Sequence, residues 1–368
     1  MRQFEYGDEQ ITDNEILIAI PSIVIGVGIL TMPRSIAEDT VSADGWISLL
    51  VGGVFVIFLT WLVGKLGSRF PQQPFLEYAS KVISRPGAIG MTLLFSTLGV
   101  LIAAYEMRVI AQVSSKYLFE ETPVPVIGLT FLLVVVYAVC GTKAGWFRIN
   151  MMFFPIIVFI SLSVVLFTTG WFKMENLLPA FKTDIGSYLD AFKNSILSFT
   201  GFGIILFFSV LVKDPKGMPK KAAIGMSYAV VLYILFYIMC IGVFGNLVTA
   251  NLQFPTIELA KNVEIPGGFF ERFESIFFVI WIMAIFNTTV MALGAALMAI
   301  QSVFRQVRKE KVVFMLSPLI FLIGMIPHDE NELGTFGSFL GYYGFFMTTL
   351  VTFLLLIIAK LRGVKGHE

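Results

Sequence analysis

The sequence predicts an all-α membrane protein with about ten transmembrane helices, folded as one domain over residues 1–368. Three observations lead to this prediction. Apolar residues make up 57% of the chain and charged residues only 14%, whereas soluble globular domains carry about 25% charged residues. The apolar residues occur in runs of the length that a membrane helix needs. Basic and acidic loops alternate between these runs.

The predicted spans are the long apolar runs, because a helix needs about 20 such residues to cross the hydrocarbon core. In chain order they cover residues 16–33, 45–64, 86–115, 122–142, 149–172, 194–212, 222–248, 275–304, 312–327 and 333–359. The ninth run is marginal in length for a span. Two shorter stretches are expected to be partly helical: residues 75–84, which are amphipathic, and residues 255–262, which could fold back toward the membrane.

The positive-inside rule tests this count independently, because a miscounted helix would invert every later loop. With the N-terminus inside, one side of the membrane collects lysines and arginines, as after the second, sixth and eighth spans. The other side carries mostly acids, among them Glu38, Asp44 and Glu330. The alternation holds across all ten spans. Both termini are therefore predicted to be cytoplasmic, in a multi-pass membrane protein.

Composition also excludes several kinds of site. The chain has two cysteines and two histidines, which leaves no disulfide framework and no metal cluster. The net charge is +1, so bulk attraction to nucleic acid is not implied. No nucleophile–base pair is visible. We expect no catalytic residue, no metal, no cofactor and no enzyme activity.

The first and sixth spans each carry a Gly-x-Gly motif near the middle of an otherwise apolar helix. Gly26 and Gly28 form the first motif, and Gly201 and Gly203 form the second. Matching interruptions five spans apart indicate two inverted halves of five helices, which we place at residues 1–192 and 193–368. Such paired breaks are the best sequence indication of a transporter-type binding site. The alternative is that each motif is only a helix-packing contact.

The physical basis of such a site is the backbone that unwinding exposes. Free N–H and C=O groups at membrane depth are tolerated only where they line a cavity or meet a ligand. A half-helix N-terminus favours a carboxylate, and freed carbonyls can accept an ammonium. We therefore expect the ligand to contact the two motifs and their neighbours: Gly26, Gly28, Phe199, Thr200, Gly201 and Gly203.

Four side chains in other spans are further candidates for ligand contact. Glu106 is the only acid well inside a span, and intramembrane charges are costly unless they are functional. It could receive an ammonium, relay a proton, hold two helices together, or lie solvated near the outer interface. Ile102 is one turn away on the same helix face. Asn287 and Thr288 lie mid-span in the eighth run, where they form a polar wall or simply hydrogen-bond within their own helix.

Several motifs together resemble a known family. These motifs are Gly26-Val27-Gly28-Ile29-Leu30-Thr31-Met32-Pro33-Arg34 before Asp44-Gly45-Trp46, then Arg69-Phe70-Pro71 before Phe75-Leu76-Glu77-Tyr78, and Asn176-Leu177-Leu178-Pro179 before Ser198-Phe199-Thr200-Gly201-Phe202. The chain resembles the B subunits of bacterial spore germinant receptors over essentially its whole length.

The resemblance implies a member of the amino acid–polyamine–organocation superfamily with the leucine-transporter fold. It also implies a place in the spore inner membrane, beside an A subunit and a lipoprotein C subunit, and a role in sensing a small nutrient, often an amino acid. Some proton-coupled relatives carry a lysine in the fifth span. Residues 149–172 contain no lysine and no acid, which disfavours coupled uptake.

Three functions remain open at this point. The first is a nutrient-sensing receptor subunit that binds its ligand and triggers germination without transporting it. The second is a proton-coupled amino-acid transporter. The third is an ion or water conduit that opens in a complex when the ligand binds.

Overall fold

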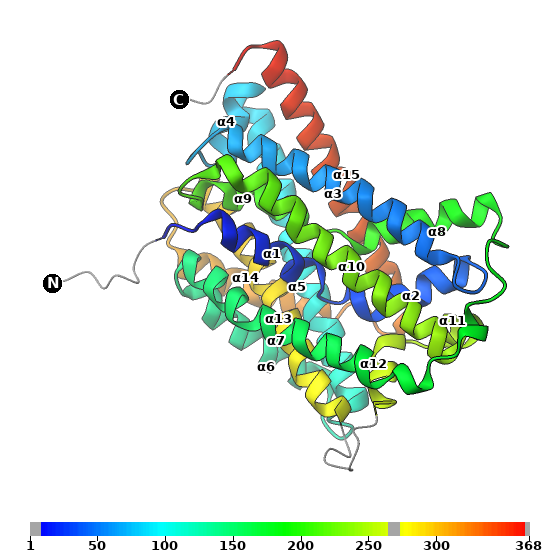
Figure 1. The fold of residues 1–368 in the computed structure, drawn as a ribbon. Coiled ribbons are helices and arrows are strands. Elements are labelled where there is room, and N and C mark those ends of the chain that lie inside the picture. Colours follow the sequence, from blue (N-terminus) through cyan, green and yellow to red (C-terminus); the bar gives the residue numbers. More distant parts are fainter. Residues whose placement is uncertain (1–8, 264–272, 365–368) are drawn as a thin grey trace.

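The computed structural model describes residues 9–263 and 273–364, and these residues form a helical bundle without a β-sheet (Figure 1). The helices, in chain order, are α1 (Asp13–Val24), α2 (Gly28–Asp39), α3 (Gly45–Arg69), α4 (Phe75–Val82), α5 (Arg85–Tyr117), α6 (Val124–Cys140), α7 (Lys143–Phe167), α8 (Ile185–Ser198), α9 (Ile205–Phe208), α10 (Met218–Phe244), α11 (Asn246–Asn251), α12 (Pro255–Lys261), α13 (Phe273–Val303), α14 (Lys309–Gly324) and α15 (Glu330–Leu361).

The predicted breaks in the first and sixth spans are confirmed. Helices α1 and α2 meet at an angle of 55°, and the unwound residues between them are the first Gly-x-Gly region. Helix α8 is followed by the short helical segment Phe202–Leu211, which is bent from it by 42°. Gly201 permits the second bend, because its φ of +114° is strained for any residue with a side chain.

The number of spans stays a prediction. Within the described residues, six single helices and the two bent pairs are long and apolar enough to cross a membrane. The predicted fourth and ninth spans correspond to α6 and α14, which have only 17 and 16 residues. The two inverted halves are likewise untested. Their predicted boundary at residue 193 lies inside α8, because Asp184 accepts a hydrogen bond from the Ser187 N–H and starts this helix at Ile185.

The two shorter stretches that were expected to be partly helical form short helices at opposite ends of the bundle (Figure 1). Residues 75–84 contain α4, whose Phe75 and Tyr78 are buried. Residues 255–262 contain α12, which packs against α2, α10 and α13. The Thr256 hydroxyl donates a hydrogen bond of 2.7 Å to the Ile29 carbonyl, next to the first break.

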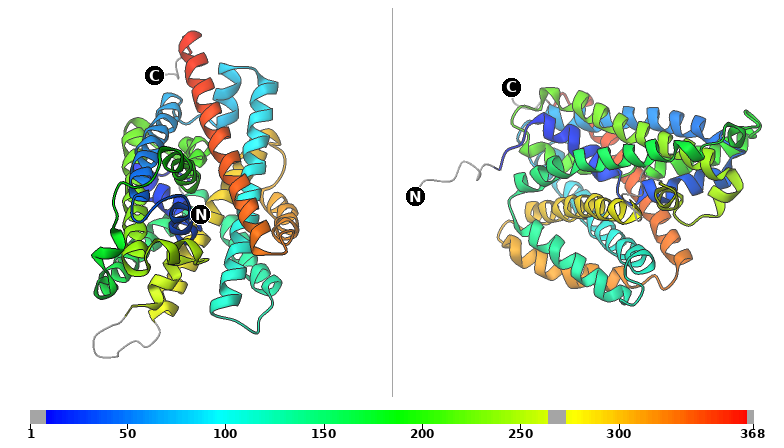
Figure 2. Two further views of the ribbon diagram at one scale, coloured as in Figure 1. Left: turned by 90° about the vertical axis from the view of Figure 1, so that its right-hand side faces the viewer. Right: turned by 60° about the horizontal axis from the view of Figure 1, so that its bottom comes forward.

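The broken helices lie inside the bundle, where the other helices surround them. Helix α1 packs against α7, α10 and α13, and α8 packs against α2 and α3. Helix α5 crosses the bundle in close contact with α13, and α15 lies along its side (Figure 2). This arrangement brings the two breaks, the middle of α5 and the middle of α13 together.

Candidate ligand-binding site

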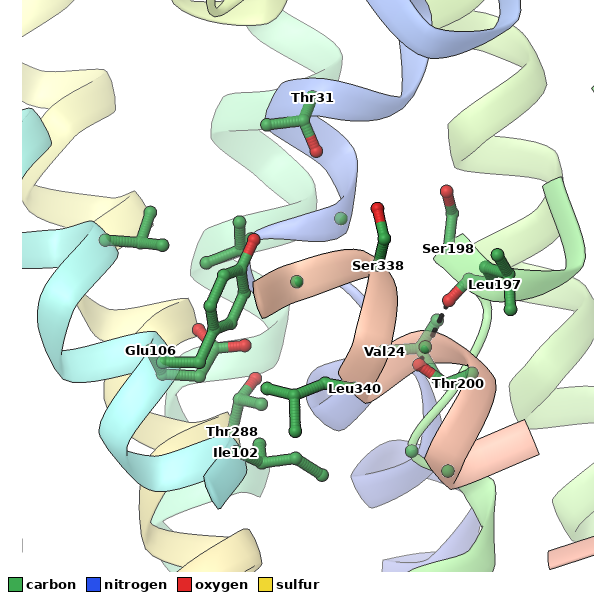
Figure 3. Close-up of a pocket in the computed structure, with 18 of the residues that line it drawn as sticks. Val24, Thr31, Ile102, Glu106, Leu197, Ser198, Thr200, Thr288, Ser338 and Leu340 are labelled. Carbon is green, nitrogen blue, oxygen red and sulfur yellow. Dashed lines mark hydrogen bonds between the residues drawn. The ribbon is translucent and has the colours of Figure 1, made fainter. Parts of the chain in front are cut away.

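A cavity of about 830 Å³ lies between the two broken spans, α5, α13 and α15 (Figure 3). Most of the predicted ligand residues line it: Gly28, Ile102, Glu106, Thr200, Gly201, Gly203 and Thr288. Figure 3 shows Ile102 and Glu106 projecting from α5 beside Thr288. Seven of the ten predicted residues thus line one cavity although they are far apart in the chain, and their contact with a ligand stays a prediction.

The two ends of the cavity differ in polarity. Toward the predicted outer side the wall includes charged and polar side chains at helix ends, among them Arg34, Glu38 and Glu330. At the opposite end the wall includes Phe95 and Phe207, whose ring centroids are 5.4 Å apart. Phe75 of α4 packs on both rings. The cavity thus extends from the polar end to an aromatic cluster formed by Phe75, Phe95 and Phe207.

Glu106 lies against the break in the first span. Its side chain is buried, at 6% exposure, and its Oε2 atom has no hydrogen-bond partner among the described residues. The Val27 backbone N–H is hydrogen-bonded to this carboxylate. A Cβ atom on Gly26 would lie 3.1 Å from Oε1 and 3.3 Å from Oε2. The carboxylate therefore occupies the N-terminal end of α2, where the helix dipole favours a negative charge.

The backbone carbonyls freed at the first break are capped by side chains from α10 and α13. The Thr288 hydroxyl lies 3.1 Å from the Ile23 carbonyl and 3.3 Å from the Ser22 carbonyl. The Tyr233 hydroxyl donates to the Val24 carbonyl at 2.7 Å. These bonds explain how unwound backbone persists at membrane depth. They also occupy carbonyls that were expected to be free for an ammonium, which leaves Glu106 as the acceptor with spare capacity.

Trp281 adds a further cap, since its Nε1 donates to the Gly26 carbonyl at 3.3 Å. Sequence reasoning missed both Trp281 and Tyr233. Each is an aromatic residue with a polar atom in the middle of an apolar span, and such atoms usually find a partner when they are buried. That signal was available. It did not indicate which backbone group each side chain would reach.

The second break is a tight crossing of backbone and side chains. Thr200 Oγ1 donates to the Leu197 carbonyl at 3.0 Å, as drawn in Figure 3. A Cβ on Gly203 would collide with the Thr348 hydroxyl, and a Cβ on Gly28 would collide with the Tyr233 hydroxyl and lie 3.0 Å from the Ser198 carbonyl. Close approach of the two broken spans thus requires glycine at Gly28.

Three predicted ligand residues lie behind the cavity wall. Phe199 is fully buried and stacks on Tyr233, with ring centroids 5.0 Å apart. Asn287 is fully buried and donates to the Ser22 hydroxyl at 2.9 Å. Gly26 borders the Glu106 carboxylate and is not part of the wall. These residues hold the broken helix in place.

Within the described residues, no group of three or more histidine, cysteine, aspartate or glutamate side chains is arranged to hold a metal ion. Two arginine and lysine side chains near the cavity mouth are paired with acids: Arg34 with Glu38 at 2.7 Å, and Lys116 with Glu330 at 3.6 Å.

Comparison with known proteins identifies the relatives of this chain. The family model described as "Spore germination protein" matches residues 10–333. Spore germination protein GerLB of Bacillus cereus is 39% identical over 100% of this chain and 98% of its own length. Spore germination protein YndE of Bacillus subtilis (strain 168) is 31% identical over 96% and 97% of the two chains.

Among solved structures, MhsT in complex with L-phenylalanine is similar in fold, with a TM-score of 0.69 over 95% of this chain and 98% of that chain, at 14% sequence identity. MhsT has the leucine-transporter fold. This similarity confirms the predicted leucine-transporter-like fold class.

Proposed function

The chain belongs to the spore germination protein family and is a transporter-like, multi-pass membrane subunit of a spore germinant receptor; we propose that it binds a small germinant, of the amino-acid class, in the cavity between its broken helices. Its relatives are germination proteins and transporter-fold proteins, and it is not an enzyme. The observation that carries the proposal is the buried Glu106 carboxylate, which has an unpartnered oxygen beside the cavity.

The cavity offers a separate group to each end of an amino acid. The ammonium pairs with Glu106, because an unpaired buried carboxylate is costly and a cation relieves that cost. The ligand carboxylate is repelled by Glu106 from the start of α2. It binds instead at the second break, where the backbone at Gly201 and Gly203 lines the cavity. Ile102 and neighbouring apolar residues contact the ligand side chain.

Binding triggers germination by shifting an existing equilibrium between two helix arrangements. Moving such a switch from 1:99 to 99:1 requires about a 10⁴-fold difference in affinity, or ~5.5 kcal/mol. A helix dipole acting on one charge supplies only about 0.3–2 kcal/mol. The remainder comes from contacts that form fully in one arrangement, and Ile102, Glu106 and Thr288 are the side chains placed to supply them.

Proton-coupled amino-acid transport is the second candidate. The transporter fold and a buried carboxylate that can carry a proton favour it. Against it, the only lysine of α7 is Lys143, the first residue of that helix. We therefore favour a receptor that binds without coupled uptake. Ligand-gated conduction of ions or water is a third candidate, which the aromatic cluster of Phe75, Phe95 and Phe207 disfavours in this closed arrangement.

Family membership supports a proposal for the location and the partners. We place the chain in the spore inner membrane with both termini on the cytoplasmic side, in a complex with A and C subunits. The connecting loops are short, and no separate output domain is present in the described residues. The signal must then pass through contacts with the partners rather than through a soluble domain of this chain.

Uptake into vesicles distinguishes the candidates. The purified chain is reconstituted alone, and each protein amino acid is supplied singly in labelled form, with a proton gradient and without one. A receptor gives saturable binding without gradient-dependent accumulation. Accumulation that follows the gradient would establish the transporter instead. Leakage of a trapped ion on adding the amino acid would establish the conduit.

A further inference from the structure

A cluster of exposed lysines lies where α3 and α10 meet, at the end of the bundle that holds α4. The helices run side by side (Figure 1). Their backbones approach closely, since a Cβ on Gly64 would lie 2.8 Å from the Pro219 Cα. The residues that follow these two contacts, Lys65 and Lys220, are both exposed. Lys216, in the turn before α10, is exposed as well.

These three lysines have no ion-pair partner among the described residues. Three acids lie near the cluster without pairing with its ammonium groups, and one of them is Asp13, whose carboxylate lies against Gly217. Asp214 accepts a hydrogen bond from the Lys216 backbone N–H at 3.2 Å. Glu15 accepts from the Thr12 backbone N–H at 2.7 Å. The three lysine ammonium groups are thus not ion-paired within the described residues, although carboxylates lie near them.

The surface next to the lysines is apolar and aromatic. The Lys65 ammonium lies 4.7 Å from the centroid of the Trp61 ring, and Trp61 stacks on the half-exposed Phe58. Farther along the same helices Val54 and Val231 are 59% and 64% exposed. In a membrane protein this surface faces acyl chains. The positive charges therefore lie at the end of a lipid-facing surface, at the depth where tryptophan and lysine meet headgroups.

From this arrangement we propose that the ends of α3 and α10 bind the headgroup of an anionic phospholipid. Its phosphate lies among Lys65, Lys216 and Lys220, and its acyl chains run along the surface of Phe58 and Val231. Clustered basic residues between transmembrane helices are suited to anionic headgroups. A soluble anion would leave the aromatic surface unused, and an acidic protein does not extend into the hydrocarbon. The proposal is independent of the germinant.

The site is placed to influence the broken first span. Lys221, next to Lys220, donates a hydrogen bond to the Asn14 side chain at the start of α1. Just ahead of α1, the Ile11 backbone pairs with that of Leu211 and Lys213, through two hydrogen bonds of 2.9 Å. A lipid bound at the start of α10 therefore stabilises the segment around residues 211–221, to which residues 11–14 are hydrogen-bonded.

Quenching of tryptophan fluorescence by brominated lipids tests the proposal on the full-length chain in mixed micelles. Brominated phosphatidylglycerol is compared with brominated phosphatidylcholine. Trp61→Phe identifies the part of the signal that comes from Trp61. The charge variant is Lys65→Gln with Lys220→Gln. The matched control is Lys311→Gln with Lys360→Gln, two exposed lysines on α14 and α15.

We expect phosphatidylglycerol to quench Trp61 at a lower mole fraction than phosphatidylcholine does, by roughly 5-fold per lysine, or about 25-fold for the pair. The preference falls by about this 25-fold in the charge variant, which keeps Lys216, is unchanged in the control, and weakens in 1 M salt because exposed charges are then screened. Equal quenching by the two lipids would overturn the proposal, as would a preference that is undiminished in the charge variant. Displacement of the lipid by inorganic phosphate at similar concentration would also overturn it, in favour of a soluble anion.

Discussion

Replacing Glu106 by glutamine tests the role of the buried carboxylate. Glutamine keeps the size of the side chain and removes its charge. An ammonium about 4 Å away, at an effective dielectric constant of about 20, gains ~4 kcal/mol from this charge. Truncating one partner of a buried charge pair costs about 2–5 kcal/mol. The germinant concentration needed for a half-maximal response should therefore rise by roughly 30-fold to several thousand-fold.

The assay is the dose–response curve of spores that carry the variant, followed by the fall in optical density after the nutrient is added. The germinant is first identified by supplying amino acids singly to wild-type spores, and variant levels are matched by immunoblot. Glu106→Asp keeps the charge and should lose much less sensitivity. Arg108→Gln removes a charge two residues away, at a position that does not line the cavity, and should leave the threshold unchanged. A Glu106→Gln threshold within about 3-fold of wild type would refute the ammonium contact.

Three further changes have defined outcomes. Gly28→Ala places a methyl group against the Tyr233 hydroxyl, and such overpacking costs about 1–3 kcal/mol of stability. The germinant threshold should rise while membrane insertion stays intact. An unchanged threshold would contradict the close crossing of the two broken spans. Thr288→Val removes the hydroxyl that caps carbonyls at the first break, and a buried carbonyl without a hydrogen bond costs about 1–3 kcal/mol. This variant should shift the germinant threshold, whereas Thr288→Ser should not. Equal thresholds for the two variants would show that the hydroxyl has no role. Asp44→Asn should lower the melting temperature at neutral pH and flatten its fall in acid, and an unchanged melting profile would contradict this.

The Asp44 prediction follows from its surroundings at the start of α3. Burial alone would raise the pKa of Asp44. Four hydrogen bonds to its carboxylate outweigh this effect and hold the pKa below its usual value. They come from the backbone N–H groups of Phe181, Lys182 and Thr183 and from the Thr183 hydroxyl. A carboxyl with a lowered folded-state pKa stabilises the protein above its unfolded pKa of about 4. This stabilisation is lost as the pH falls through the folded-state pKa.

The fold was predictable because its main signals are local. Runs of apolar residues give the spans, and Gly-x-Gly motifs give the breaks. The ends of helices were less predictable. Helix α8 begins upstream of the predicted apolar run, and the part outside that run carries exposed charged residues such as Asp190 and Lys193. Hydropathy alone does not detect a helix that continues outside the hydrocarbon.

The sequence indicated which helices contribute residues to the candidate site, but it did not indicate which face of each helix points into the cavity. Glu106 and Ile102 share a face of α5, so the acid indicated its neighbour. Asn287 and Thr288 are adjacent in sequence, yet they point about 100° apart around α13, and only Thr288 lines the cavity. No sequence pattern indicated which of them would face the ligand, since both are polar residues in an apolar helix.

Equilibrium binding of a radiolabelled amino acid to the purified, reconstituted chain tests the central claim most directly. The amino acid is the germinant that wild-type spores respond to, and Glu106→Gln is measured in parallel with Arg108→Gln. If Glu106 binds the ammonium of the ligand, we expect saturable binding to the wild type and to Arg108→Gln, and at least 30-fold weaker binding to Glu106→Gln. Equal binding to Glu106→Gln and the wild type, or no saturable binding to a folded wild-type chain, would contradict this claim.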